Sequence, residues 1–410
     1  SIEKAVALVE HASEMERDLI MAARDRYPAD YDTDNRRPVD EGFAERMKTV
    51  YEKYPEIDDV AIVYAMSLFL LEERRERRDV NDPDLIRLHG VLTGVLDRNI
   101  AHPGACHLYI HATESSQEPE RALACAEYLS ATIPTASHIQ HMPSHTWNEV
   151  GYWGKSVEAN ITAYQSDLKS RQNQGFSYVP AHNLHMLLFA ASMDGQSAIA
   201  IQAGKDYTKE TDNTMYHALT LLRFGRFDEI PGIAPRPSIG DIEGGFWDFA
   251  QGYAALRNGD ADSAQDYLNK LQDLAANSTG EFRRHDAAHL VGLSAAILQG
   301  EIFRSQGNLD EAITAFRRAV VLDEEQPYDE PEPIPYAARH WLGAALLEVE
   351  RYAEAEQEYR TELADHPHNV WSLHGLKTAL EAQGKTDAAV DTDFEESTAR
   401  MDVWITSSIL

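Results

Sequence analysis

A spacing of about 34 residues between matching small and aromatic side chains is the strongest constraint on the fold of this chain. One copy of the pattern begins with Gly300 and Phe303, and the next begins 43 residues later with Gly343 and Leu346. A third copy begins at Lys377, 34 residues after Gly343. Recurrence at about this length predicts stacked helix–turn–helix units. Further positions of the pattern are Gly307, Ala312 and Phe316, then Ala355 and Tyr359, then Gly384 and Ala389, with an upstream copy at Gly252, Gly259 and Ala264.

The sequence pattern of the whole chain indicates helices. Apolar residues recur at spacings of three and four, and proline or glycine interrupts the pattern at short intervals. This predicts an all-α solenoid of antiparallel helix pairs. Two loop-rich interruptions are expected at residues 231–245 and 326–335. We expect residues 1–230 to form N-terminal helical repeats and residues 231–410 to continue the same superhelix.

The repeat pattern over residues 248–395 resembles the tetratricopeptide repeat, a helix–turn–helix unit of about 34 residues. The stretches HPGACHLYIHATE, HIQHMPSHTW and AHNLHM are similar to stretches of uncharacterised bacterial proteins of this group. The resemblance implies a superhelix whose concave groove binds ligands. It also implies further repeats before Ser1, and it implies no particular reaction.

The charge of the chain narrows the range of partners. Its 37 Lys and Arg against 68 Asp and Glu give a net charge of −31. A surface this acidic repels phosphate, which argues against nucleic acids and anionic membranes as partners. No apolar run reaches the length of about 18 residues that a membrane span needs. Two cysteines exclude a disulfide framework and a four-cysteine zinc site. The sequence favours a soluble, cytoplasmic protein.

Histidines concentrate in one part of the chain, with eight of the 17 between residues 102 and 185. Seven of them occupy three positions of the repeat pattern, which are three and four residues apart and therefore share one face of a helix. Neighbouring helices pack about 8–10 Å apart, so that imidazoles of consecutive repeats can converge on one metal ion. The predicted metal ligands are His107, His111, His138, His141, His145, His182 and His185.

Pro143 counts against this simple geometry. A proline either begins a helix in its first turn or kinks it. If a helix begins at Pro143, then His138 and His141 come from a loop and only His145 keeps its helical position. For histidines taken singly, such as His89 and His366, we expect hydrogen bonding within the core or plain exposure.

The ligand types suggest which metal is bound. Imidazole suits copper, iron, nickel and zinc. Six or seven histidines exceed the three protein ligands of a typical catalytic zinc site. We therefore expect copper or iron ahead of zinc, with room for two ions. Glu114, three residues after His111, is the predicted catalytic residue, as a ligand or as a base. Two histidines with this carboxylate would suit non-haem iron. His285 and His289 fall on a helix predicted over 278–305.

These observations favour a metal-dependent enzyme. We predict an oxidoreductase that acts on a small organic substrate in the groove, and the oligomeric state is left open. One alternative is a scaffold that binds a protein or peptide partner, for which a basic partner would suit the charge. The other is a metal storage or delivery protein.

Overall fold

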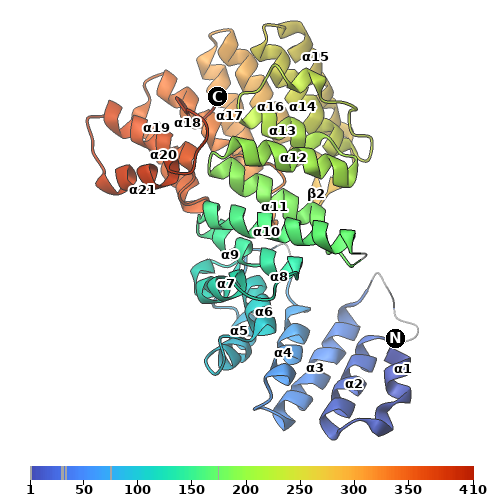
Figure 1. Ribbon diagram of the computed structural model, residues 1–410. Coiled ribbons are helices and arrows are strands. Elements are labelled where there is room, and N and C mark those ends of the chain that lie inside the picture. The colour runs from blue at the N-terminus through green and yellow to red at the C-terminus, as the bar shows by residue number, and fades with distance from the viewer. Residues whose placement is uncertain (1, 29–31, 33–34, 74–75, 174) are drawn as a thin grey trace. The chain divides into compact units, whose positions relative to one another are not determined.

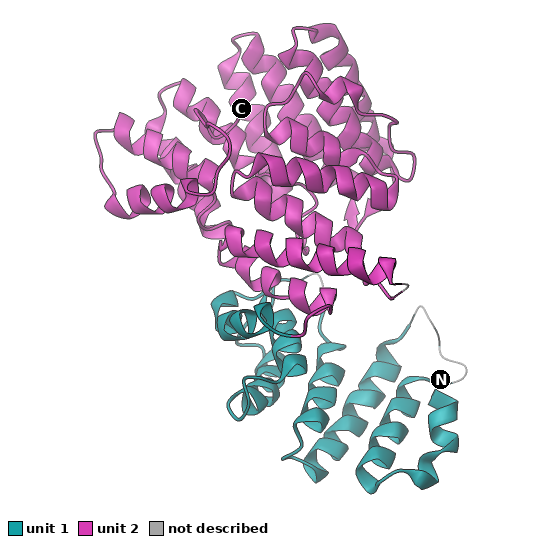
Figure 2. Cartoon of the chain, in the orientation of Figure 1, with its two compact units in different colours: residues 1–132 teal, residues 133–410 magenta. Residues whose placement is uncertain are grey.

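A computed structural model describes residues 2–28, 32, 35–73, 76–173 and 175–410 (Figure 1). Apart from one short hairpin, the regular elements in these ranges are helices that pack in sequential pairs. The all-α fold of stacked helix pairs is therefore confirmed. The chain divides into two compact units, residues 1–132 and residues 133–410 (Figure 2).

Unit 1 is a stack of helices in which each pairs with the next along the chain. Local sequence sets where they begin. The Ser13 side chain and Glu16 form a reciprocal capping box at the start of α2, and the Asp82 carboxylate caps α5 in front of Pro83. The elements are α1 Ile2–Ala7, η1 Val9–His11, α2 Glu14–Arg26, α3 Arg37–Lys53, α4 Asp58–Phe69, α5 Pro83–Leu96, α6 Pro103–Thr113, η2 Pro119–Ala122 and α7 Leu123–Ser130.

A disulfide links two helices of unit 1. Cys106 on α6 is bonded to Cys125 on α7, with 4.8 Å between their Cα atoms. Both residues are buried. The bridge fixes α6 against α7, and α6 is the helix that carries His107 and His111.

Unit 2 holds the remaining helices around a single hydrophobic core that extends from Trp153 to Ile409. The boundary expected between residues 230 and 231 lies inside this unit. The elements are α8 Ser137–His141, α9 Pro143–Glu149, α10 Trp153–Gln172, α11 Pro180–Met193, α12 Ser197–Thr211, α13 Met215–Arg223, η3 Ile230–Gly232, α14 Asp241–Arg257, α15 Ala261–Asn277, β1 Glu281–Phe282, β2 His285–Asp286, α16 Ala287–Ser305, α17 Leu309–Glu324, α18 Arg339–Glu348, α19 Tyr352–Asp365, α20 Val370–Ala382 and α21 Ala388–Thr398.

The helix predicted over residues 278–305 begins later than expected. Residues 281–286 form a two-stranded antiparallel hairpin instead, and α16 begins at Ala287. Arg283 and Arg284 make its turn with φ of +53° and +72°. Positive φ at both central residues is the type I′ geometry that matches the twist of paired strands.

Early and late helices of unit 2 are joined directly. The Trp153 indole at the start of α10 donates to the Pro367 carbonyl (2.8 Å). The Trp371 indole on α20 donates to the Ser192 carbonyl of α11 (2.8 Å). Gly151 has φ +73° and faces the Pro367 carbonyl so closely that a Cβ atom would overlap it. Helices that lie far apart in the sequence therefore share one packed interior.

No helix in the described ranges combines the length and apolar character that a membrane crossing needs.

Candidate metal centre

Three of the predicted ligands come together in unit 2. Pro143 begins α9, as one of the two alternatives had it, but Met142 before it keeps helical dihedral angles (φ −50°, ψ −39°). His141 and His145 therefore remain one turn apart, and their Nε2 atoms lie 2.9 Å from each other. The concern that Pro143 would move His141 out of its helical position does not hold.

The third member, His182, lies in the first turn of α11. Its ring centroid is 4.7 Å from that of His141 and 5.8 Å from that of His145. The ligand nitrogens of the three histidines all lie within 4.8 Å of one another. His138 is a neighbour of this group, with its ring 5.6 Å from that of His141 and 4.6 Å from that of Tyr178.

Burial and outer contacts define the electrostatics of the group. His141 and His145 are buried. Burial, reinforced by the neighbouring imidazoles, holds the pKa of His141 well below its usual range, so the ring is neutral. Its Nδ1 atom faces the Asn160 amide oxygen at 3.3 Å. The Nδ1 atom of His145 faces the Glu330 carboxylate at 4.0 Å, which is an ion-pair distance rather than a hydrogen bond.

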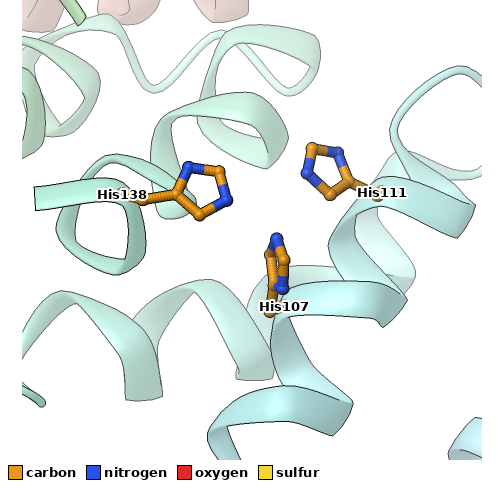
Figure 3. Close-up of side chains that lie close together, drawn as sticks. All are labelled: His107, His111 and His138. Atoms are coloured by element: carbon orange, nitrogen blue, oxygen red, sulfur yellow. The ribbon is translucent and has the colours of Figure 1, made fainter. Parts of the chain in front are cut away.

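Unit 1 holds a second group on α6. His107 and His111 lie on successive turns of this helix, with ring centroids 5.0 Å apart (Figure 3). The Nδ1 atom of His111 lies 2.8 Å from the Glu114 carboxylate, which is buried directly after the helix. His89 nearby bonds the Ala112 carbonyl through Nε2 (3.2 Å), which is the core role expected for it.

The remaining predicted ligand, His185, takes part in a different network. Arg283 donates to its Nδ1 atom (2.8 Å), and its ring stacks on Tyr216. A lone pair that accepts from a guanidinium is not available to a metal through the same nitrogen. Burial, with the nearby charge of Arg283, lowers the pKa of His185 well below its usual range. Among the described residues His185 joins none of the groups with metal-binding spacing.

The acidic loop at residues 326–335 brings carboxylates to three histidines. Asp329 accepts from Arg283 (2.6 Å) and faces the Nε2 atom of His285 at 3.2 Å. Arg283 also donates to the Glu330 carbonyl (2.6 Å), next to the side chain that faces His145. The third contact, further along the loop, joins Glu332 to His366 (3.2 Å), whose other nitrogen faces Glu362 (2.7 Å).

Sequence reasoning missed this loop as part of the site. The run of acidic residues and prolines in QPYDEPEPIP indicates an interruption between repeats and does not by itself indicate a contact with a histidine. Its place beside His145 depends on the folding of unit 2, in which residues 326–335 lie far from residues 141–145 in sequence. No local pattern indicates such a contact.

A tetratricopeptide repeat family model matches residues 249–330 and again residues 297–370. The chain carries tetratricopeptide repeats. No curated protein matches the sequence. Among solved structures, the human IFIT1 dimer with m7Gppp-AAAA is similar at 10% identity and a TM-score of 0.36, over 97% of this chain and 84% of that one. The Cut9–Hcn1 hetero-tetramer of the APC/C is similar at 10% identity and a TM-score of 0.34, over 100% of this chain and 98% of that one.

The matched residues 249–370 run from within α14 through α19 to the first residue of α20, and His107, His111, His141, His145 and His182 all precede them. The two features of the molecule are therefore separate in sequence. A tetratricopeptide repeat scaffold forms much of unit 2, and the histidines occupy helices that precede the matched repeats.

Proposed function

We propose that unit 2 binds a transition metal ion through His141, His145 and His182. The observation that supports this most is the orientation of the rings. The Nε2 atoms of His141 and His145 lie 2.9 Å apart, while Nδ1 of His141 faces the Asn160 amide oxygen at 3.3 Å and Nδ1 of His145 faces the Glu330 carboxylate at 4.0 Å. Metal-binding histidines in proteins nearly always show this arrangement, because the outer acceptor fixes the tautomer and the ring plane.

The 2.9 Å between the two Nε2 atoms bears on the choice of metal. Two nitrogens bound at about 2.0–2.1 Å lie about 2.9 Å apart for a bond angle of about 90°, and about 3.3 Å apart for a tetrahedral angle. Angles near 90° are typical of tetragonal copper and of octahedral iron. In the metal-free state the same separation fits an N–H···N hydrogen bond. We therefore retain copper or iron ahead of zinc.

The unit 1 group repeats the arrangement. His111 turns Nδ1 to Glu114, as His141 turns Nδ1 to Asn160. A metal in this unit would bind His111 through Nε2, together with His107 on the preceding turn. We propose that Glu114 orients His111 and serves as the base of the site. A second ion held in this unit is part of the proposal.

Chemistry follows from the ligand set. Three histidines leave coordination positions for water, dioxygen or a substrate, and a redox-active metal supplies electron transfer when it is bound. We infer that the chain is a metal-dependent oxidoreductase acting on a small organic substrate. Metal storage or delivery is the second candidate. A site made of three side-chain ligands is compatible with it.

Metal content decides between these proposals and a scaffold without metal. The full chain is purified without tag or chelator and analysed by elemental mass spectrometry, then titrated with Cu(II), Fe(II) and Zn(II) by calorimetry. We expect a stoichiometric ion that is lost in His141→Ala and His145→Ala. The matched control is His289→Ala, a partly exposed histidine beside Asp286 that lies outside the groups. A folded chain that binds no metal after reconstitution would refute the proposal.

The redox part has its own test. Bound Cu(II) should give an electron paramagnetic resonance signal with nitrogen hyperfine structure, which disappears with ascorbate and returns with oxygen. Binding of zinc alone would agree with the proposed metal site and would contradict the proposed oxidoreductase activity. Reversible metal release without any turnover would favour storage or delivery.

A further inference from the structure

Residues 400–410 cross unit 2 as a non-helical strap. They follow α21, and their first part is held by α11 and α12. The Arg400 guanidinium pairs with the fully buried Asp194 carboxylate through two bonds of 2.6 and 2.7 Å. The Asp402 carboxylate accepts the backbone N–H groups of Ser197 and Ala198 at 2.6 and 2.9 Å.

The second of these contacts completes a helix end. The residue before α12, Gln196, makes no side-chain cap. The first N–H groups of a helix need an acceptor, and a carboxylate there also meets the positive end of the helix dipole. Asp402 supplies this cap from a distant part of the sequence. The start of α12 is thus a receptor for an acidic side chain carried by another segment.

The far part of the strap is buried between α13 and α18–α20. Ser408 donates from Oγ to the His340 carbonyl (2.8 Å) and meets the Tyr359 hydroxyl (2.7 Å). Ile405 and Ile409 enter the hydrophobic core, whereas Trp404 is 87% exposed. Some side chains are inserted and others point outward, which is how an extended peptide is recognised on a protein surface.

Arg223 adds a receptor group that the strap uses only in part. It is 2% exposed, and its guanidinium lies 3.7 Å from the centroid of the Trp371 ring. One nitrogen donates to the Ser408 carbonyl (3.4 Å). Within the described ranges, Nε and Nη2 have no hydrogen-bond partner. A buried guanidinium with two unused donor nitrogens is suited to bind peptide carbonyls more closely than this strap does.

We propose that the seam between α11–α13 and α18–α20 is a peptide-binding surface, and that residues 400–410 are its intramolecular occupant. The partner is an extended peptide with the chemistry of the strap. It carries an acidic side chain for the start of α12, a small hydroxyl side chain six residues later, and aliphatic residues three and seven residues after the acid. A tethered occupant has an effective concentration of about millimolar, so an external peptide binds only when the strap is released.

The test releases the strap after folding. A protease recognition sequence is inserted between Ala399 and Arg400 of the full chain, and the folded protein is cut. A labelled peptide of residues 400–410 is then added, and exchange is followed by fluorescence anisotropy. We expect saturable 1:1 binding to the cut protein and none to the uncut protein. Binding should weaken at least tenfold for the peptide Asp402→Ala and change less than twofold for Trp404→Ala.

Three results would overturn the proposal. The cut, folded protein could keep its strap without exchange, which would make the strap a fixed part of the core. It could release the strap and bind no labelled peptide. Uncut chains could exchange straps between copies, which size-exclusion chromatography with light scattering would show as a dimer, and the occupant would then be a second copy. Metal content does not enter any of these readouts, so they are independent of the proposed enzyme.

Discussion

Reduction of the Cys106–Cys125 disulfide should destabilise unit 1 and leave unit 2 unchanged. The bridge spans 19 residues. In the chain-entropy model, closing a loop of this length stabilises the folded state by about 3 kcal/mol. With a urea m-value of about 2 kcal/mol per M for a unit of this size, the unfolding midpoint of unit 1 should fall by about 1.5 M.

The chain offers an internal reference for this measurement. All six tryptophans lie between Trp147 and Trp404, and therefore in unit 2. Indole fluorescence thus reports the unfolding of unit 2, whereas far-UV circular dichroism reports both units. Urea titrations are run with and without a phosphine reductant. The reductant should lower the urea midpoint of the dichroism transition that fluorescence does not report.

A double Cys106→Ala/Cys125→Ala variant provides the control. It should unfold like the reduced protein and should not respond to reductant. If reduction moves the dichroism midpoint by less than about 0.3 M, or moves the fluorescence curve equally, then the bridge does not act on unit 1 as the loop entropy requires.

Three further predictions concern unit 2. Burial opposes the charging of His366, but its two carboxylate partners outweigh it and raise its pKa well above the usual range. Its contribution to stability is therefore complete below its unfolded-state pKa of about 6.5 and is lost as pH rises through its folded-state pKa. The unfolding free energy between about pH 6 and 10 should consequently fall more steeply for the wild type than for His366→Gln. Glu330→Gln should weaken metal binding about 10–100-fold in calorimetry, and an unchanged affinity would contradict its orienting role. Gly307→Ala, at φ +78° with open space, should cost about 1–2 kcal/mol. Gly151→Ala, at φ +73° against a backbone carbonyl, should cost about 1–3 kcal/mol more in chemical denaturation, and equal costs would exclude the contact.

The fold could be predicted largely because its determinants are local. Small residues such as Gly300 and Gly343 recur where a neighbouring aromatic ring crosses the helix, and in the structure Phe316 and Tyr359 lie directly over them. The same locality explains the pairing of His141 with His145 and of His107 with His111, which are each one helical turn apart. Periodicity alone gave these pairs.

The parts that could not be predicted depend on distant segments. His185 has the same repeat position as His141, but Arg283 donates to its nitrogen from a hairpin turn that lies far along the sequence. The contact of Glu330 with His145 likewise joins residues that lie far apart in the sequence. The start of the helix predicted over residues 278–305 was wrong because the chain turns at Arg283 and Arg284 with positive φ. Positive φ is unusual for residues other than glycine, and no sequence pattern indicates it.

The direct joining of early and late helices in unit 2 changes how this repeat protein should unfold. Linear repeat arrays behave as one-dimensional chains, in which each repeat contacts only its neighbours and the ends fray first. Here Trp153 is bonded to Pro367 and Trp371 to Ser192, so the early and late helices of unit 2 protect each other. Loss of one repeat removes contacts of another at the opposite end of the sequence. Unit 2 should consequently unfold in one cooperative step, and its folding should be slow for a helical protein because contacts so distant in sequence must form before the unit is stable.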